Sequence, residues 1–475
     1  MKLLQLYKQS AEGRDVWTRR WAQCARYTMP ANDDDSATLF DATAGDAADM
    51  LAANMFSLLT PPESMWLSLS RASEFSPDPD AATAALRAHL NNSNFYTTIH
   101  QSYLDLAILG TACLFFSENP IGAESAFNFT AIPMNDISVL RNGGGDLTAV
   151  FHSAAMSAAD VMEKYPSWTP PANLRDGIKQ NPEMKLQLVQ SVVANNGGPG
   201  APECSAGGES RRSVSEGGWE FTAWIDADGE LENNIVATGR FEQCPYIIFR
   251  WSAAAGESYG RSPVLRALPD IKTANKVVEL VLKNATIAVS GIWQADDDGV
   301  INLSNINLTP GAIIPKAVGS SGLTPLRSGA DFDVSQLVLG DLRARIRHAM
   351  LADRLSILSD KEMTATEIIA RNTDMMRVLG ATYGRLLGEL IRPLTMRALA
   401  ILARRGVIDP ISLHIDARLC YVAPIAQLAA DERVTQVLSW LSAAGSAGFA
   451  DAINRPAVMD YLASAMHIPE ELINA

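Results

Sequence analysis

The chain has 475 residues, of which 53 are acidic and 39 are basic, so its formal net charge is −14. This balance argues against a protein that holds nucleic acid tightly and non-specifically through a basic surface. Hydrophobic residues make up 47% of the sequence, and its length predicts about two to four structural units. Its five scattered cysteines form no CxxC pair, which predicts reduced thiols. With no apolar signal segment and no apolar run of membrane-spanning length, the sequence predicts a soluble protein made in a cytoplasm.

The first half of the chain is predicted to alternate helices and short strands. Residues 1–29 carry an amphipathic pattern that ends before Pro30. Three further helices are expected over Ala44–Leu59, Asp80–Asn91 and Phe95–Leu109. Strands are expected at Trp66–Leu69, Cys113–Ser117, Phe127–Ile132, Thr148–His152, Trp219–Ile225, Ile235–Thr238 and Tyr246–Trp251. The region between the fourth and fifth of these strands looks less regular, and its Gly-, Ser- and Pro-rich residues 195–217 are expected to be an exposed, flexible loop.

A long amphipathic helix is predicted to begin at Ser262. The Ser262 hydroxyl can cap it, and Pro263 occupies the first helical position, where its missing N–H costs nothing. Apolar residues recur with heptad spacing as far as Val289, with Asn275 in the one polar slot. Pro269 is expected to bend or restart the helix one turn in.

A second helix is predicted over Asp333–Asp353, after a short β segment. Its apolar side is formed by Val334, Leu337, Leu342, Ile346 and Ala349. The arginines of this region could face DNA phosphates, or they could form a solvated face with an Asp341–Arg345 pair one turn apart. These arginines are Arg343, Arg345, Arg347 and Arg354. On the residues alone, the solvated face is favoured.

A third, very long helix is predicted to begin at the capping box Thr364-Ala-Thr366-Glu367 and to end at the cap glycine Gly406. About forty residues span roughly 60 Å, more than one small domain can bury. The helix is therefore expected to need neighbours along its length, most simply other copies of the chain. Pro393 is expected to kink it. A smooth stripe that lets another backbone approach is formed by Gly380, Gly384 and Gly388.

Two short strands are expected after this helix, at Leu413–Ile415 and Leu419–Val422. The remaining residues, Pro424–Ala475, are expected to form a small helical cap whose first helix reaches about Leu441. The predicted fold class is therefore mainly α with small β elements, an α+β protein.

One segment matches an enzymatic motif. Gly256-Glu-Ser258-Tyr-Gly260 has the GxSxG pattern in which a sharp strand-to-helix turn exposes a nucleophilic serine. Six residues separate Trp251 from Ser258, however, and the chain downstream is nearly all helical, without βα units that would place an acid and a histidine. A turn into a helix is the favoured interpretation, and a serine hydrolase using Ser258 stays as an alternative.

Two acidic turns resemble calcium loops. Asp296-Asp-Asp298-Gly299 and Asp226-Ala-Asp228-Gly229 lack the bidentate Glu of an EF-hand and are better interpreted as hairpin turns. With six histidines in the chain and no His/Cys cluster, no metal site and no cofactor are expected.

Several segments together resemble the portal proteins, or head-to-tail connectors, of short-tailed, podovirus-type bacteriophages. The resemblance covers most of the chain. It rests on the order and spacing of residues 41–44, 51–62 with Trp66, 259–263, 267–272 and 363–367. The serine motif falls inside the Tyr259-Gly-Arg-Ser-Pro263 segment of this pattern, which weakens the hydrolase alternative.

The resemblance implies a subunit with five parts. Residues 1–261 would form a wing, with 364–423 adding a long wing helix and short strands. Residues 262–289 and 331–353 would be two stem helices, 290–330 a clip between them, 354–363 a tunnel loop and 424–475 a crown-like helical C-terminus.

The resemblance also implies that the protein is not an enzyme, and it implies a set of partners. Copies of the chain would form a ring, usually dodecameric, at one capsid vertex of the virion, after assembly in the host cytoplasm and without a membrane. Double-stranded DNA would pass through its channel. Other partners would be the terminase packaging motor, the major capsid and scaffolding proteins, and tail adaptor proteins. A helical scaffold that never meets DNA is a further alternative.

Site residues follow from this layout. The tunnel loop would present Arg354, Ser359, Asp360, Lys361 and Glu362 to the DNA, of which Arg354 and Lys361 would make weak guiding contacts. The stem would contribute Lys276, Lys283, Arg343 and Arg347. The clip would dock partners through Asp296, Asp297 and Asp298, and the long helix would be capped by Thr364, Thr366 and Glu367. An acidic chain with few basic residues near the bore suits a channel that must let DNA slide.

Overall fold

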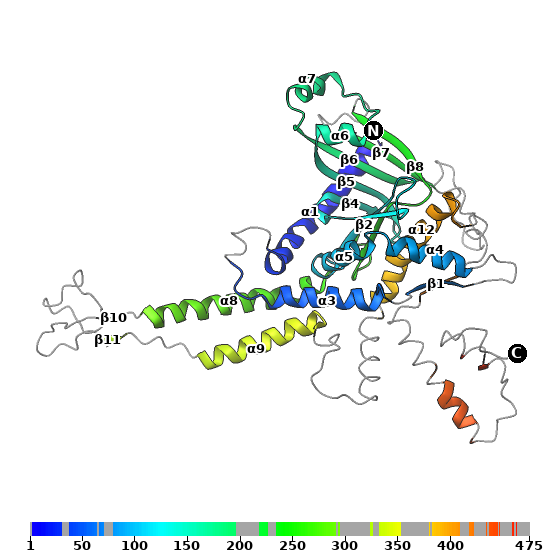
Figure 1. Cartoon of the computed structure of the whole chain (residues 1–475). Helices are drawn as coiled ribbons and strands as arrows, with labels where there is room; N and C mark the ends of the chain where they lie inside the picture. The colour runs from blue at the N-terminus through cyan, green and yellow to red at the C-terminus, as the bar shows by residue number, and fades with distance from the viewer. Residues whose placement is uncertain are drawn as a thin grey trace, which may run out of the picture.

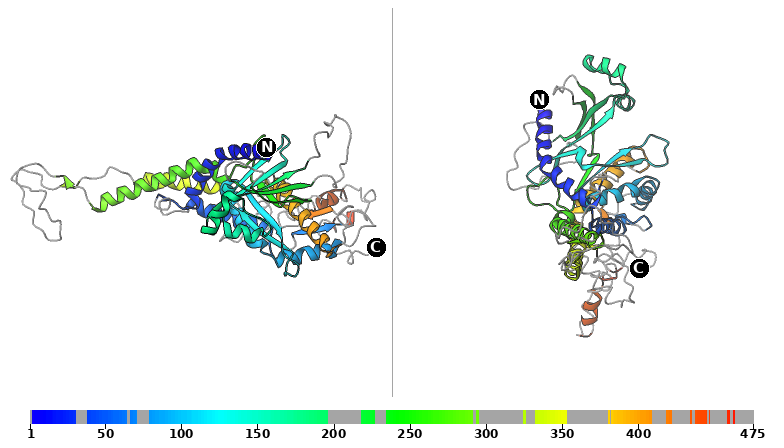
Figure 2. Two further views of the ribbon diagram at one scale, coloured as in Figure 1. Left: turned by 90° about the horizontal axis from the view of Figure 1, so that it is seen from above. Right: turned by 90° about the vertical axis from the view of Figure 1, so that its left-hand side faces the viewer.

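A body of helices and antiparallel sheets carries two long helices that project from one side (Figures 1 and 2). The computed structural model describes residues 2–30, 38–63, 66–70, 79–195, 218–226, 234–290, 293–294, 324–325, 332–352, 380, 382–408, 418–421, 434, 437–444, 446, 458–459 and 462. The α+β class predicted from the sequence is confirmed.

The helices of the body lie where the sequence predicts them. They are α1 (Lys2–Thr28), α3 (Thr43–Leu59), α4 (Pro79–Asn91) and α5 (Phe95–Leu109). In α1 the predicted apolar side is in contact with the core, and Trp17, Trp21 and Cys24 are buried. Apolar periodicity and local capping define these helices, which is why their bounds were predictable to within a few residues.

A three-stranded antiparallel sheet has the order β3-β2-β9. Its strands are β2 (Thr111–Glu118), β3 (Phe127–Ile132) and β9 (Tyr246–Arg250). The sheet shares one large apolar core with α3, α4, α5 and the last long helix. Aromatic rings fill its centre, where Phe116 and Phe129 lie with centroids 4.3 Å apart.

A five-stranded antiparallel sheet has the order β4-β5-β6-β7-β8 (Figure 1). Its strands are β4 (Ile137–Arg141), β5 (Leu147–Ser157), β6 (Lys185–Ala194), β7 (Trp219–Ile225) and β8 (Ile235–Phe241). Two short helices, α6 (Ala158–Lys164) and α7 (Ala172–Gln180), separate β5 from β6. The expectation of a less regular region after β5 is wrong for residues 158–194, where α6, α7 and β6 lie.

The strand predicted at Leu419–Val422 is confirmed, and it pairs with a strand from the first part of the chain. Strand β12 (Arg418–Tyr421) pairs antiparallel with β1 (Leu67–Ser70), far away in the sequence, with Leu67 opposite Tyr421. The proposed partner at 413–415 lies outside the described residues. Another two-stranded pair, β10 (Trp293–Gln294) with β11 (Thr324–Pro325), lies beyond the projecting helices (Figure 1).

The projecting helices are α8 (Pro263–Ser290) and α9 (Phe332–Ala349), and we call this pair the arm. Helix α8 continues through Pro269, so the expected restart is wrong. The proline ring removes one N–H near the start of a 28-residue helix, and the remaining hydrogen bonds keep the helix whole.

The last long helix is described from Gly380 onward, apart from one residue. It contains a π-helical turn, Leu387–Ile391, followed by α12 (Arg392–Arg404). Pro393 lies at the start of α12 and cannot donate a hydrogen bond to Glu389, which explains an irregular turn at the place where a kink was predicted. The predicted cap is confirmed, because Gly406 has φ +70° and its N–H donates to the Ala403 carbonyl.

A buried arginine, Arg397, fixes helix α12 to the three-stranded sheet. Arg397 is 7% exposed, and its Nε and Nη1 donate to the carbonyls of Phe116 and Gln243. Burial lowers the pKa of Arg397 to about 10. No helix in the described ranges is both long and apolar enough to cross a membrane.

Replacing Asp105 of α5 by asparagine is expected to stabilise the fold at neutral pH. Burial raises the pKa of Asp105 to about 6, above the ordinary value of 3.8. A raised folded-state pKa adds stability below pH 3.8, and this contribution is lost as the pH rises through 6. The Asp105→Asn variant should therefore gain about 3 kcal/mol in free energy of unfolding at pH 7 and little at pH 4.

Urea unfolding at the two pH values measures this difference. The exposed Asp176→Asn of α7 is the matched control and should change stability little at either pH. Equal effects of the two substitutions at pH 7 would show that Asp105 carries its charge without penalty.

Candidate functional site: the arm and its joint

The base of the arm is buried against the body. Val264, Leu268, Ile271 and Ala274 of α8 pack with Leu342 and Ile346 of α9. The same cluster includes three alanines near the start of α3, together with Cys24 of α1 and Ile108 of α5. The first half of the predicted heptad pattern is thus satisfied within one chain.

The outer half of the arm keeps apolar side chains in solvent. Leu280 and Leu282 of α8 are 49% and 50% exposed, and Leu337 and Val338 of α9 are 76% and 45% exposed. Leu282 and Leu337 belong to the predicted apolar sides of their helices. The sequence pattern therefore continues beyond the point where the single chain can bury it.

Asn275, the predicted polar slot, fastens α8 to the segment before α3. Its Oδ1 accepts hydrogen bonds from the N–H groups of Phe40, at 2.6 Å, and Asp41, at 3.1 Å. Its Nδ2 donates to the Thr38 carbonyl at 2.9 Å. Asn275, the one polar side chain in the heptad pattern, is thus 7% exposed, and its polar atoms form hydrogen bonds with backbone groups.

Asp41 joins the same segment to α9. Its carboxylate accepts from the Thr43 N–H at 2.9 Å and from Arg343 Nε at 2.9 Å. Burial by itself would raise the pKa of Asp41, but the hydrogen bonds from Thr43 and Arg343 outweigh it and hold the pKa below its ordinary value. Asp41 and Asn275 together fix both arm helices to one short piece of chain.

The two lysines predicted for the stem are paired on α8 itself. Arg347, also predicted for the stem, lies in the last turn of α9. Lys276 and Lys283 both contact Glu279 of α8, and their side chains are 61% and 65% exposed. Arg345 pairs with Asp270 of α8 at 2.9 Å. The predicted Asp341–Arg345 pair is therefore wrong, because the neighbouring helix supplies a carboxylate within reach.

Replacing Asp41 by alanine is expected to lower the free energy of unfolding by about 2–3 kcal/mol, because Arg343 and the Thr43 N–H both lose their acceptor. The pKa of Asp41 is depressed by folding, so its contribution is present above pH 3.8 and lost as the pH falls below it. Guanidinium unfolding at pH 7 measures the loss. The exposed Asp49→Ala on α3, the helix that follows Asp41, is the control. A loss of the same size there would contradict this role of Asp41.

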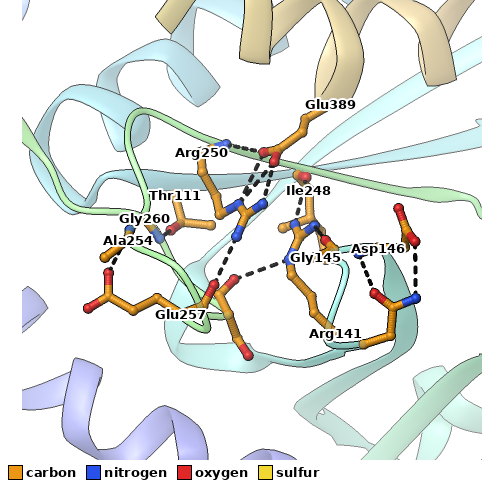
Figure 3. Close-up of polar contacts among 12 residues, drawn as sticks. Thr111, Arg141, Gly145, Asp146, Ile248, Arg250, Ala254, Glu257, Gly260 and Glu389 are labelled. Atoms are coloured by element: carbon orange, nitrogen blue, oxygen red, sulfur yellow. Dashed lines mark hydrogen bonds and ion pairs between the residues drawn. The ribbon is translucent and has the colours of Figure 1, made fainter. Parts of the chain in front are cut away.

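The arm enters the body at a joint where two glycine backbones touch. Gly110 ends α5 with φ +81°, and a Cβ there would lie 2.4 Å from the Ser262 nitrogen. A Cβ on Gly260 would lie 2.1 Å from the Gly110 oxygen. The Gly260 N–H donates to Thr111 Oγ1 at 2.7 Å (Figure 3). The predicted cap is confirmed, since Ser262 Oγ accepts from the Leu265 N–H at 2.8 Å.

A buried ion pair ties this joint to the last long helix (Figure 3). Arg250, at the end of β9, donates from Nε to both carboxylate oxygens of Glu389, at 3.1 and 3.2 Å. The Arg250 N–H also donates to Glu389 at 3.0 Å, and Nη1 donates to the Glu257 carbonyl at 2.9 Å. The two side chains are 9% and 18% exposed. Arg250 thus links β9, to which it belongs, to the turn into α8 and to the π-helical turn.

Arg141 of β4 completes the joint from the five-stranded sheet. It donates to the carbonyls of Ser258, Ile248 and Gly145, at 3.2, 3.3 and 3.0 Å. Burial and the charge of Arg250 lower the pKa of Arg141 to about 10, with Arg385 acting in the same direction and Glu389 opposing it. Four separate elements therefore meet where the arm begins.

The serine motif belongs to this joint. Tyr259 is buried between Trp17 and Trp21, with ring centroids 6.0 and 5.1 Å away, and its hydroxyl accepts from the Val139 N–H. Ser258 contributes its carbonyl to Arg141. Within the described ranges, the Ser258 hydroxyl has no hydrogen bond with a histidine or a carboxylate. The favoured interpretation as a turn leading into a helix agrees with this geometry.

The remaining sequence-predicted site residues lie outside the described residues. They are Asp296, Asp297, Asp298, Arg354, Ser359, Asp360, Lys361, Glu362, Thr364, Thr366 and Glu367. In the part of the chain that is described, no group of three or more His, Cys, Asp or Glu residues could hold a metal ion. Sequence reasoning missed the pairing of Arg250 with Glu389, because 139 positions separate them.

The fold and the arm define a structural subunit with a mixed helical and antiparallel body and one projecting helical pair. The chain belongs to the family described as bacteriophage head to tail connecting protein, whose model matches residues 1–473. It therefore has the connecting role between phage head and tail, and the predicted family is confirmed.

Individual relatives agree with this assignment. The chain is 21% identical over 416 residues to the portal protein of Escherichia phage T7, covering 82% of this chain and 72% of that protein. It is 20% identical over 413 residues to the portal protein of Enterobacteria phage T3, with the same coverage. The probable portal protein of Bordetella phage BPP-1 is 20% identical over 458 residues, covering 90% of this chain and 79% of that protein.

Proposed function

We propose that the chain is one subunit of a homo-oligomeric portal ring, a dodecamer, at one vertex of the phage capsid. The arms of the copies surround a channel through which double-stranded DNA is packaged and later ejected. The packaging motor and the tail adaptors dock at the outer end of the arms, and capsid and scaffolding proteins contact the body.

The observation that carries this proposal is the exposed outer half of the arm. Leu282 and Leu337 continue the apolar pattern that is buried at the base, and a single chain leaves them in water together with Leu280 and Val338. Identical copies arranged around an axis would cover each arm with its neighbours through a heterologous contact that closes into a ring. Membership of the head-to-tail connecting family supports the same assembly.

The layout of the subunit follows from the same assignment. Residues 1–261 and 364–423 form the wing, α8 and α9 the stem, and 290–330 the clip at its outer end. Residues 354–363 form the tunnel loop, and 424–475 form the crown.

The charge of the chain suits a channel. Each phosphate neutralised by a protein cation adds to affinity through counterion release, and a ring multiplies this effect by its copy number. The arm lysines described above are paired with Glu279, and Arg343 is paired with Asp41. Such an arm attracts DNA weakly and lets it slide.

Negative-stain electron microscopy of the purified chain tests the ring. We expect closed rings with a central hole a few nanometres wide. Monomers or open filaments at high concentration would overturn the proposal, and they would favour a helical scaffold without a DNA role.

A double substitution tests the observation itself. Leu282→Glu with Leu337→Glu should shift the chain from rings to monomers in native mass spectrometry, because each new carboxylate would be buried between arms. The control is Ile121→Glu, an equally drastic change at a residue that is 96% exposed on the β2–β3 loop. Rings that survive the double substitution would remove the arm from the interface.

The DNA role is tested by Arg354→Glu with Lys361→Glu in the proposed tunnel loop. Rings should form normally, while phage particles should contain or retain less DNA. Unchanged genome content in particles that carry the double variant would exclude this loop as a guiding contact.

A further inference from the structure

The π-helical turn Leu387–Ile391 holds Glu389 away from a partner on its own helix. The Arg392 N–H donates to the Leu387 carbonyl five residues earlier, which is the hydrogen bond of a π turn. In an α-helix, residues four apart lie one above the other, so Arg385 and Glu389 would be neighbours. The wider turn places Glu389 against Arg250 of β9 instead.

Arg385 shows the consequence of this arrangement. Its Nη1 is enclosed and has no hydrogen-bond partner among the residues that the structure describes. Both oxygens of the Glu389 carboxylate accept hydrogen bonds from Arg250. Buried polar groups are nearly always paired, and an arginine cannot lose its charge to escape the penalty. Two arginines thus compete for one carboxylate, and the structure satisfies only Arg250.

The helix has room to change its register at this point. Gly384 directly precedes Arg385 and Gly388 directly precedes Glu389, and a Cβ on either glycine would meet nothing within 4 Å. Pro393 cannot donate to the Glu389 carbonyl, so the α-helical hydrogen bond that would resist a change there is missing. The predicted glycine stripe is therefore open space at both positions, rather than a tight contact within the chain.

We propose that the Leu387–Ile391 turn is a two-state latch. In the state described here the turn is π-helical, and Glu389 binds Arg250 and so holds the long helix to β9 and to the turn that enters the arm. In the other state the turn is α-helical, and Glu389 pairs with Arg385 and releases Arg250. The latch couples the long helix to the base of the arm, and it operates in a single chain, so it does not depend on the ring.

Hydrogen–deuterium exchange of the full chain tests the latch through Arg385→Met, which keeps most of the apolar stem of the side chain. Without Arg385 the released state loses its ion pair, and the amides of residues 252–261 should exchange about threefold more slowly. The exposed Arg392→Met on the same helix is the control and should leave exchange unchanged. Unchanged or faster exchange in Arg385→Met would overturn the proposal.

A second background separates the latch from simple relief of an unpaired buried group. Arg250→Lys retains the charge but loses the forked contact with Glu389, so it favours the released state. In that background Arg385→Met should reverse its effect and speed exchange of residues 382–391 about threefold, because Glu389 then depends on Arg385. If Arg385→Met slows exchange in both backgrounds, then Arg385 destabilises the fold only through its unpaired buried nitrogen. In that case the turn has no second, α-helical state.

Discussion

Replacing Gly260 by alanine is expected to destabilise the chain by about 2–4 kcal/mol, through overpacking of backbone against backbone. A Cβ at this position would lie 2.1 Å from the Gly110 oxygen and 2.9 Å from the Arg250 Cβ. Neither neighbour is the end of a flexible side chain. The strand that leaves α5 and the turn that enters α8 would have to separate, and the hydrogen bond from Gly260 to Thr111 would be lost.

Thermal and urea unfolding of the purified chain measure this effect. The matched control is Gly256→Ala in the same turn, where φ is +80° but a Cβ would meet nothing within 4 Å. That variant should lose only about 1 kcal/mol, from the left-handed backbone alone. If Gly260→Ala is no less stable than Gly256→Ala, the two glycine backbones are not in the close contact described.

The helices of this chain were predictable because their determinants are local. Ser262 caps α8, Pro30 follows α1, and Gly406 ends α12, each within a few residues of the apolar pattern that it limits. The heptad pattern of α8 also predicted which residues face inward at the base of the arm. It could not show that the chain buries only the first half of that pattern, because burial depends on what lies alongside.

The strands were harder to predict for a physical reason. Strand β6 begins with alternating residues and continues as a nearly fully buried run, a pattern that a short helix could also produce. Its identity as a strand comes from pairing with β5 and β7, one of which lies beyond two intervening helices. The pairing of β12 with β1 could not be predicted for the same reason, since β1 lies about 350 positions earlier and no local signal connects the two.

The joint shows the same division between local and long-range information. The Tyr259–Pro263 segment belongs to the family pattern in the sequence, and Pro393 predicts a kink near Glu389. That Arg250 connects these two segments could be seen only in the folded structure, because nothing in the local sequence indicates that they are neighbours. The resemblance located the segment, and the structure supplied its physical role as the anchor of the arm.

Replacing Arg250 by methionine is expected to cost about 3–5 kcal/mol, the usual effect of removing one partner of a buried ion pair. Glu389 would lose its partner in a place where only 18% of its side chain is exposed, and the Glu257 carbonyl would lose its donor. The loss therefore measures the unpaired carboxylate as well as the missing contact.

A second variant separates the penalty of the unpaired carboxylate from the loss of the contact itself. Arg250→Met combined with Glu389→Leu removes both charges and should recover much of the stability, because an apolar pair of similar volume can replace a buried ion pair. The control is Arg261→Met, which breaks the exposed pair with Glu257 in the turn that follows Arg250 and should change stability little. Urea unfolding of the three variants is the measurement. If the double variant is as unstable as Arg250→Met, then Arg250 acts through its own hydrogen bonds to the turn rather than through Glu389, and the long helix is held to the arm by packing alone.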